Sequence, residues 1–286
     1  MEKYSWKDFG KIANIDDLSG YLAGKEYLHG SYCHYTSLVA IEKILESRSF
    51  YLSNVSGFND KIDTKQFSPQ QNFFSLCFST GINENLSLWY MYAGLDGHGG
   101  RLNFTKAQIK KLLSNASYEL CEIDNNKNIV EIIATLINGK SMKISFRDIL
   151  YYIDRGCSID LKYNTMTNHI IPKSGFDEFL EQYKGFTKSL IWYYEKETRL
   201  LVELIGESIN YIKPGKKYIV KMSIDDHVFQ KMKIDLAPEI TDANFDFILS
   251  DKNNIKQFIK TSSKVNLSAY SGTIEMKLCE KCSLKY

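Results

Sequence analysis

The chain has 286 residues, of which 44% are hydrophobic and 13% aromatic, with only 4 prolines. This composition is enough to bury the core of one large domain or two small ones, and it argues against a disordered chain. The formal charge is +2, with 36 basic against 34 acidic residues, so no overall field of one sign predicts a nucleic-acid partner.

The N-terminus, cysteines and histidines bear on where the protein acts. Residues 1–17 are charged and lack the apolar segment of a signal peptide, and no apolar run approaches the length of a membrane span. Cys279 and Cys282 form a single C-x-x-C pair without the second ligand pair that structural zinc needs, and the histidines show no metal-ligand spacing. We therefore expect a cytoplasmic, metal-free protein with reduced thiols and no membrane partner.

The first half of the chain is predicted to alternate strands with short helices. Strands are indicated by alternating or continuous apolar residues, and helices by apolar residues at helical spacing behind a capping residue. Thr105 and Gln108 have the spacing of a capping box. Strands are predicted at 31–37, 49–54, 73–79, 101–104 and 117–123, and helices within 1–30 and at 37–47, 84–93 and 105–113.

In the second half, residues 125–191 are predicted to form a helical insertion, followed by a return to strands. The helical prediction rests on segments 128–137, 146–153 and 176–186. Strands are predicted at 198–204, 217–224, 228–236, 264–270 and 273–279, with a helix near 251–262. We expect an α+β fold in a single domain, residues 1–286, that carries this insertion.

Two glutamates one residue apart precede an apolar run in WYYEKETRLLVEL, residues 192–204. If the segment is a strand, Glu195, Glu197 and Arg199 share one face, and the carboxylates lie about 7 Å apart along it. Their repulsion would raise the pKa of one of the pair, as an acid/base site requires. The alternative, a solvated outer face of a sheet, is equally open.

Two further segments carry side chains suited to binding a nucleotide. His34 ends a predicted strand and Thr36 stands where the next helix begins, so an imidazole and helix N-terminal amides could hold a sugar hydroxyl and a phosphate. Trp89, Tyr90 and Tyr92 offer aromatic faces that suit stacking on a planar cationic ring. The simpler interpretations are a capped helix with a partly buried histidine, and aromatic core packing.

The order of histidine, tyrosine and glutamate in these segments resembles the ADP-ribosyltransferase superfamily. In that superfamily the histidine binds the NAD ribose, the tyrosine stacks on nicotinamide and the glutamate is essential for transfer. The resemblance spans roughly residues 30–205 and implies the split β-sheet core of that superfamily. The chain also looks like a bacterial family of uncharacterised domains, through H-Y-T at 34–36, F-N-D at 58–60, W-x-x-Y at 89–92, a glycine turn at 97–100 and E-x-E-x-R at 195–199.

The resemblance implies that NAD is the substrate and that no metal takes part. Glu197 would stabilise the oxocarbenium-like sugar and Glu195 would activate the nucleophile, while Arg199 would pair with the carboxylates or a pyrophosphate. Tyr35 stands where the family has glycine. The catalytic set is Glu197, Glu195, His34 and Tyr92, and the NAD contacts are His34, Tyr35, Thr36, Asn59, Asp60, Trp89, Tyr92 and Arg199.

Likeness to bacterial toxin-type transferases implies a conditional toxin, used in toxin–antitoxin or antiviral defence and held silent by an antitoxin or inhibitor protein. RNA is the favoured acceptor, because the aromatic run 192–194 could hold an unstacked base and the lysines at 213, 216, 217 and 221 could follow its backbone. Core packing and a solvated edge are the alternative interpretations. Alternative functions are a protein (arginine) ADP-ribosyltransferase, a glycosidase-type hydrolase and a non-enzymatic binding module.

Overall fold

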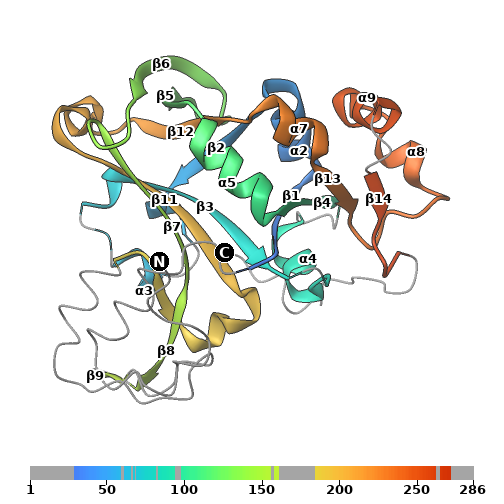
Figure 1. Cartoon of the computed structure of the whole chain (residues 1–286), viewed down its shortest axis with the longest axis horizontal. Helices are drawn as coiled ribbons and strands as arrows, with labels where there is room; N and C mark the ends of the chain where they lie inside the picture. The colour runs from blue at the N-terminus through green and yellow to red at the C-terminus, as the bar shows by residue number, and fades with distance from the viewer. Residues whose placement is uncertain are drawn as a thin grey trace. The chain divides into compact units, whose positions relative to one another are not determined.

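The structure is a computed structural model that describes residues 29–58, 61–65, 67, 69–81, 83–93, 98–155, 158–160, 184–261 and 265–271. Within these ranges the chain combines helices with mostly antiparallel strands, in agreement with the predicted α+β class (Figure 1). It divides into two compact units whose relative positions are not determined. The described residues of Tyr51–Thr80 and Ser117–Met222, with His29 and Gly30, form unit 1; Ser31–Phe50 and the described residues of Gly81–Ala116 and Ser223–Tyr286 form unit 2.

Unit 2 contains a four-stranded ladder and all but one of the α-helices in the described ranges. The ladder order is β14 (Val265–Leu267), β13 (Lys233–Leu236), β4 (Gly99–Thr105) and β1 (Ser31–Ser37), antiparallel except between β14 and β13. The helices are α2 (Leu38–Ser47), α4 (Leu86–Tyr92), α5 (Lys106–Asn115), α7 (Asp226–Lys231), α8 (Phe245–Ile248) and α9 (Asn253–Thr261). No helix of the described residues is long and apolar enough to cross a bilayer.

The predicted caps of α2 and α5 are confirmed. Ser37 precedes α2, and its side chain accepts a hydrogen bond from the backbone N–H of Ala40. Thr105 and Gln108 form the reciprocal capping box at the start of α5. These local bonds satisfy N–H groups that have no partner within the helix, which explains why the helices begin there.

Unit 1 is built around β11, which lies between β3 and β7 and runs antiparallel to both (Figure 1). A second ladder has the order β12–β5–β6, and a small sheet has the order β10–β8–β9. The strands are β2 (Ser49–Asn54), β3 (Phe73–Thr80), β5 (Tyr118–Ile123), β6 (Ile129–Leu136), β7 (Met142–Asp148), β8 (Leu150–Arg155), β9 (Ser158–Asp160), β10 (Thr187–Ser189), β11 (Glu197–Leu204) and β12 (Lys217–Ser223). Short helices are η2 (Val55–Gly57), α3 (Lys61–Thr64), η3 (Gln70–Asn72), η4 (Leu190–Glu195) and η5 (Gly206–Tyr211).

The predicted helical insertion is wrong where the structure describes it. Segment 128–137 contains β6, and segment 146–153 contains the end of β7 and most of β8. Short apolar runs do not separate helix from strand by periodicity, and the β-branched residues of β6 favour a strand that β5 pairs along its length. Most of segment 176–186 lies outside the described residues.

The other differences are smaller. Segment 228–236 holds the end of α7 followed by β13, because Asp225 caps the helix through the backbone N–H groups of His227 and Val228. The expected helix within 1–30 and the expected strand at 273–279 fall mostly or wholly outside the described residues. The remaining predicted strands and helices of the first half are confirmed within a few residues.

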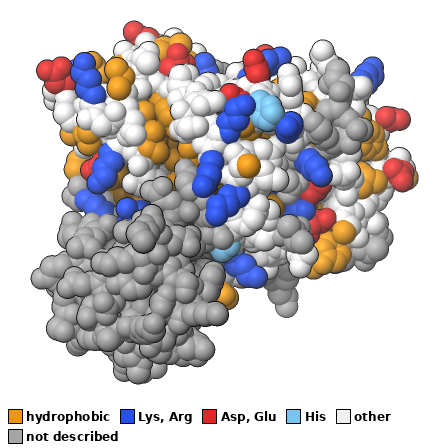
Figure 2. Space-filling view, viewed as in Figure 1, with side chains coloured by type: hydrophobic (Ala, Val, Ile, Leu, Met, Phe, Trp, Pro, Cys, Tyr) orange, Lys and Arg blue, Asp and Glu red, His pale blue; other side chains and the backbone are white. Residues whose placement is uncertain are grey.

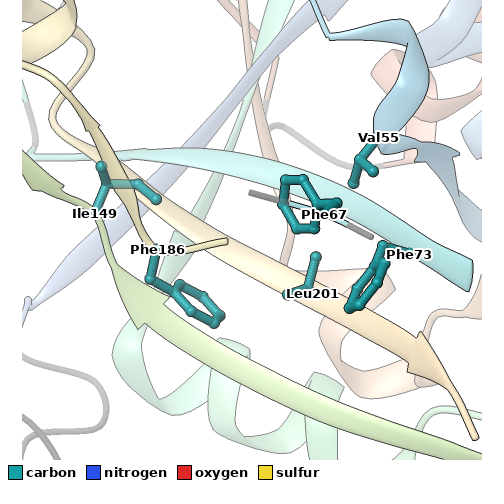
Figure 3. Close-up of a cluster of buried hydrophobic side chains, with 6 residues drawn as sticks. All are labelled: Val55, Phe67, Phe73, Ile149, Phe186 and Leu201. Carbon is teal, nitrogen blue, oxygen red and sulfur yellow. The ribbon is translucent and has the colours of Figure 1, made fainter. Parts of the chain in front are cut away.

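An apolar cluster fills one face of β11 in unit 1 (Figure 3). Figure 3 shows the rings of Phe67 and Phe73 close to Leu201, and partly buried Phe58 and Trp192 pack against the cluster. Leu201 lies two residues after Arg199, so this face of the strand changes from charged to apolar along its length. The cluster comprises Val55, Phe67, Phe73, Ile149, Phe186 and Leu201.

Replacing Gly185 tests how tightly this cluster is packed. Gly185 has φ +81°, and an added Cβ would lie 2.6 Å from Cε1 of Phe67 and 2.9 Å from Cδ2 of Leu201. Gly139 has a nearly equal φ of +77° with nothing within 4 Å of an added Cβ, so it isolates the backbone strain. We expect Gly139→Ala to cost about 1–2 kcal/mol and Gly185→Ala to cost about 1–3 kcal/mol more through overpacking. Urea unfolding measures both, and equal losses would contradict tight packing around Gly185.

Candidate active site

The E-K-E segment lies at the junction of a turn and a strand. Glu195 ends η4 and Glu197 begins β11, so the prediction that both glutamates share one strand face is wrong. Lys196 between them has a left-handed φ of 44°. The turn is anchored to the end of β3, because Ser79 Oγ donates to the Glu195 carbonyl at 2.7 Å and the Thr80 N–H donates to the Lys196 carbonyl at 3.0 Å.

The turn nevertheless brings the two carboxylates together on one nitrogen atom. Lys188 Nζ donates to Glu195 Oε2 at 2.6 Å and to Glu197 Oε2 at 3.2 Å. The three side chains are only 8%, 5% and 4% exposed, which excludes the solvated outer face as an interpretation. The ammonium also lies 4.8 Å from the ring centroid of Trp192.

Arg199 holds the other oxygen of Glu197. Its Nε donates to Glu197 Oε1 at 2.7 Å, and its two Nη atoms donate to both oxygens of Asp63 at 3.1 and 2.7 Å. Nη1 also donates to the Gly185 carbonyl at 2.7 Å, and the guanidinium lies over the ring of Phe58. The expected pairing of Arg199 with a carboxylate is therefore confirmed, and its 1% exposure leaves no surface for a pyrophosphate.

Three carboxylates and two cations make up this buried cluster, so full ionisation leaves a net charge of −1. Burial opposes ionisation of Glu197, but Arg199 and Lys188 together hold its pKa well below the ordinary value. Glu197 is therefore not the member of the pair whose pKa the predicted repulsion would raise. Burial likewise disfavours the Lys188 ammonium, but Glu197 and Glu195 raise its pKa above the ordinary value.

The sequence reasoning missed Lys188 and Asp63. Lys188 follows a segment predicted as helical and carries no motif, and Asp63 lies 136 positions from Arg199 in the sequence. Cys77 lies opposite Arg199 on β3, and burial and the nearby Glu197 carboxylate raise the pKa of its thiol. One signal for Lys188 was present in the sequence: a buried pair of glutamates requires cations, and few lysines or arginines lie close to them in the chain.

The H-Y-T residues lie on β1 in unit 2, and they do not face the same way. His34 and Thr36 are half-buried on one face, whereas Tyr35 points to the opposite face, as alternation along a strand requires. The His34 ring meets Phe50 edge-on at 5.9 Å. The Tyr35 hydroxyl accepts a hydrogen bond from the Asn85 N–H at 3.0 Å, so Tyr35 is a core residue instead of a cofactor contact.

The aromatic residues of α4 divide into core and surface. Trp89 is fully buried, its Nε1 donates to Glu84 at 2.9 Å, and its ring packs against Tyr35. This burial leaves no ring face for a ligand, which corrects the expected NAD contact at Trp89. Tyr90 is 41% exposed and Tyr92 is half-buried, so they remain the candidates for stacking.

The structure assembles the predicted site residues in two separate groups. Glu195, Glu197 and Arg199 belong to unit 1, and His34 and Tyr92 belong to unit 2. Asn59, Asp60 and the residues at 94–97 lie outside the described residues. Glu195, Glu197 and Arg199 are therefore the predicted site residues that direct hydrogen bonds link into one cluster, with Lys188 between the glutamates.

The lysines proposed to follow RNA have partners within the chain. Lys221 of β12 donates to Glu119 of β5 at 3.0 Å, and Lys216, which precedes β12, donates to Glu122 of β5 at 2.6 Å. Lys217 and Lys213 bond Asn125 and the Asn210 carbonyl. On the face shown in Figure 2, basic and acidic side chains are interspersed. These contacts favour a solvated, ion-paired surface over a backbone-tracking stripe, although β12 is not an edge strand, because it lies between β2 and β5.

No family model, curated protein or solved structure matches this chain. Among the residues that the structure describes, no group of three or more His, Cys, Asp or Glu side chains could hold a metal ion. The candidate site therefore rests on the geometry and charge of the unit 1 cluster.

Removing Asp63 tests how far Arg199 depends on it. Asp63→Asn keeps the shape but leaves a buried guanidinium with one fewer charge partner, so we expect a loss of about 3–5 kcal/mol in unfolding free energy. Asp226→Asn is the control, because the Arg48–Asp226 pair is 59% and 76% exposed and such pairs contribute less than about 1 kcal/mol. Chemical denaturation measures both, and a small loss at Asp63 would show that Arg199 does not need it.

The pH dependence of stability tests the charge of Glu197. Its pKa in the folded protein lies below the ordinary value of 4.5, so its ionised form stabilises the fold at neutral pH and this contribution is lost as the pH falls below about 4.5. We expect the stability difference between wild type and Glu197→Gln to be constant from pH 8 to about 6 and to shrink toward pH 3. A difference that stays constant down to pH 3 would mean that folding does not lower the pKa of Glu197, and a difference that grows toward pH 3 would mean that folding raises it.

Proposed function

We propose that the chain is an NAD-dependent ADP-ribosyltransferase whose chemistry is carried by Glu197 and Glu195. The observation that carries the proposal is the convergence of these two buried carboxylates on a single nitrogen cation. Transfer of ADP-ribose passes through a positively charged sugar and ends on a nucleophile, and fixed carboxylates in a water-poor site stabilise such charge where it develops.

Each carboxylate has a distinct role in this proposal. The bond between C1′ of the ribose and the nicotinamide nitrogen breaks, and its electron pair leaves with nicotinamide. Glu197, fixed through Oε1 by Arg199, stabilises the resulting cation with Oε2. Glu195 accepts the proton that the nitrogen nucleophile loses as its bond to C1′ forms.

The acceptor that this geometry favours is a cationic nitrogen group. The two glutamates already hold an ammonium, and the lysines of β12 are engaged within the chain. An arginine side chain of a protein therefore fits the pair better than an RNA base, which was the acceptor favoured by the sequence. The resemblance adds His34 at the ribose, Tyr92 at nicotinamide and a conditional toxin held silent by a partner protein, and these remain predictions.

A non-enzymatic module is the second candidate. Both oxygens of Glu197 and one of Glu195 are engaged by cations of the same chain. The same contacts would tie β11 to α3 and β10 in a protein that carries out no reaction.

Conservative replacement of each glutamate separates the two roles. We expect Glu197→Gln to abolish both nicotinamide release and transfer while NAD binding persists, because the change removes charge and keeps shape. Glu195→Gln should reduce transfer by about a hundredfold or more and spare hydrolysis of NAD. Labelled NAD is incubated with each variant and with separate RNA and protein fractions, after near-UV circular dichroism has confirmed a native fold.

The label also decides the acceptor. Label on protein supports a cationic side chain, and label on RNA alone would overturn that choice. Wild-type turnover by Glu197→Gln would remove Glu197 from the mechanism. A wild-type chain that neither binds NAD nor releases nicotinamide would return the non-enzymatic module to first place.

A further inference from the structure

The Lys188 ammonium lies on the carboxylate oxygens that the proposed chemistry needs. We propose that Lys188 is an autoinhibitory group that occupies the candidate active site in place of the substrate cation. This inference rests on the proposed function and concerns the regulation of the same site. It takes Glu195 Oε2 and Glu197 Oε2 as the oxygens that substrate must reach.

The two oxygens of Glu197 are bound by different cations. Arg199 binds Oε1 and is itself held by Asp63 and by the Gly185 carbonyl, so its position does not depend on Lys188. Oε2 is engaged by Lys188 at 3.2 Å. Withdrawal of the lysine therefore removes its bond to Oε2, while Arg199 keeps the carboxylate in place through Oε1.

Lys188 reaches the site from outside the sheet that carries Glu197. Within the described residues, β10 pairs only with β8, in parallel register with Lys188 opposite Tyr151. Its Nζ atom binds the site through the two glutamate oxygens and lies over the Trp192 ring. The side chain can leave without breaking a backbone bond between β3, β11 and β7.

Lys188 is an inhibitor by this reasoning and not an acceptor. An amine attacks C1′ only after it has given up a proton, and the two carboxylates stabilise Lys188 in its protonated form. Its departure would leave three carboxylates against one guanidinium, a net charge of −2 in a buried site. Such a site strongly favours uptake of a new cation, whether an acceptor side chain or the developing charge on ribose.

Lys188→Met tests the inference, because methionine keeps the unbranched shape and most of the length of the side chain and removes its charge. We expect NAD affinity and the rate of nicotinamide release to rise at least about tenfold. If Lys188 occupies the site in nine-tenths of the molecules, only one-tenth can bind NAD, and the apparent affinity is about tenfold lower than that of an open site. Lys188→Arg keeps a cation and should stay near or below the wild-type rate. Lys143→Met, on an exposed position of β7, is the matched control and should change nothing.

A second pair of variants tests the inference if Lys188→Met does not fold. Glu195→Gln removes one of the two carboxylates that bind Lys188, so the double variant loses an acidic group together with the lysine. Lys188→Met/Glu195→Gln should therefore release nicotinamide faster than Glu195→Gln alone. The inference would be overturned if the double variant released nicotinamide no faster than Glu195→Gln. It would also be overturned if the wild type were active and Lys188→Met released nicotinamide at the same rate or more slowly.

The outcomes also separate this inference from the proposed function. If the proposed function fails, neither the wild type nor any folded variant binds NAD, and the autoinhibitory role falls with it. If only the inference fails, the wild type binds and hydrolyses NAD and the Lys188 variants show no gain. A loss of activity in both Lys188→Met and Lys188→Arg would make Lys188 a positioning residue instead.

Discussion

The buried ion network of Asp63, Arg199, Glu197, Lys188 and Glu195 is the constraint on which the rest of unit 1 depends. Removing such charges from water costs several kcal/mol for each ion, and only well-placed opposite charges and hydrogen bonds offset that cost. The network meets this requirement with groups from α3, β10, η4 and β11. Each of these elements must therefore keep its position, because moving one would leave a buried charge without its partner.

The apolar cluster beside the network strengthens it by excluding water. The cluster begins on β11 at Leu201, two residues after Arg199, and includes Phe67 and Phe186. The Phe58 ring lies against the Arg199 guanidinium, and the Trp192 ring lies against the Lys188 ammonium. Charge pairs interact more strongly where the effective dielectric is low, so the aromatic walls and the ion network stabilise each other. Gly185 joins the two, since its carbonyl binds Arg199 and its missing side chain makes room for Phe67.

The sequence predicted the elements that local chemistry determines. Ser37 and Thr105 mark helix starts through bonds to nearby residues, and β1, β3 and β11 have apolar patterns long enough to be read directly. Segment 128–137 was assigned to a helix because the identity of its pairing partner, β5, is a non-local property. The same limit explains the site: Glu197 and Arg199 are neighbours on one strand, whereas Asp63 and Lys188 reach them only through the tertiary fold.

The order of the two units' segments along the sequence has a consequence for synthesis on the ribosome. Each unit collects segments that alternate with segments of the other, so neither is complete until its last segment, ending at Met222 for unit 1, has emerged. Asp63 cannot pair with Arg199 until a further 136 residues have been synthesised. Such non-local closure is slow and leaves apolar strands uncovered during elongation, which makes nascent and truncated chains clients for chaperones and proteases.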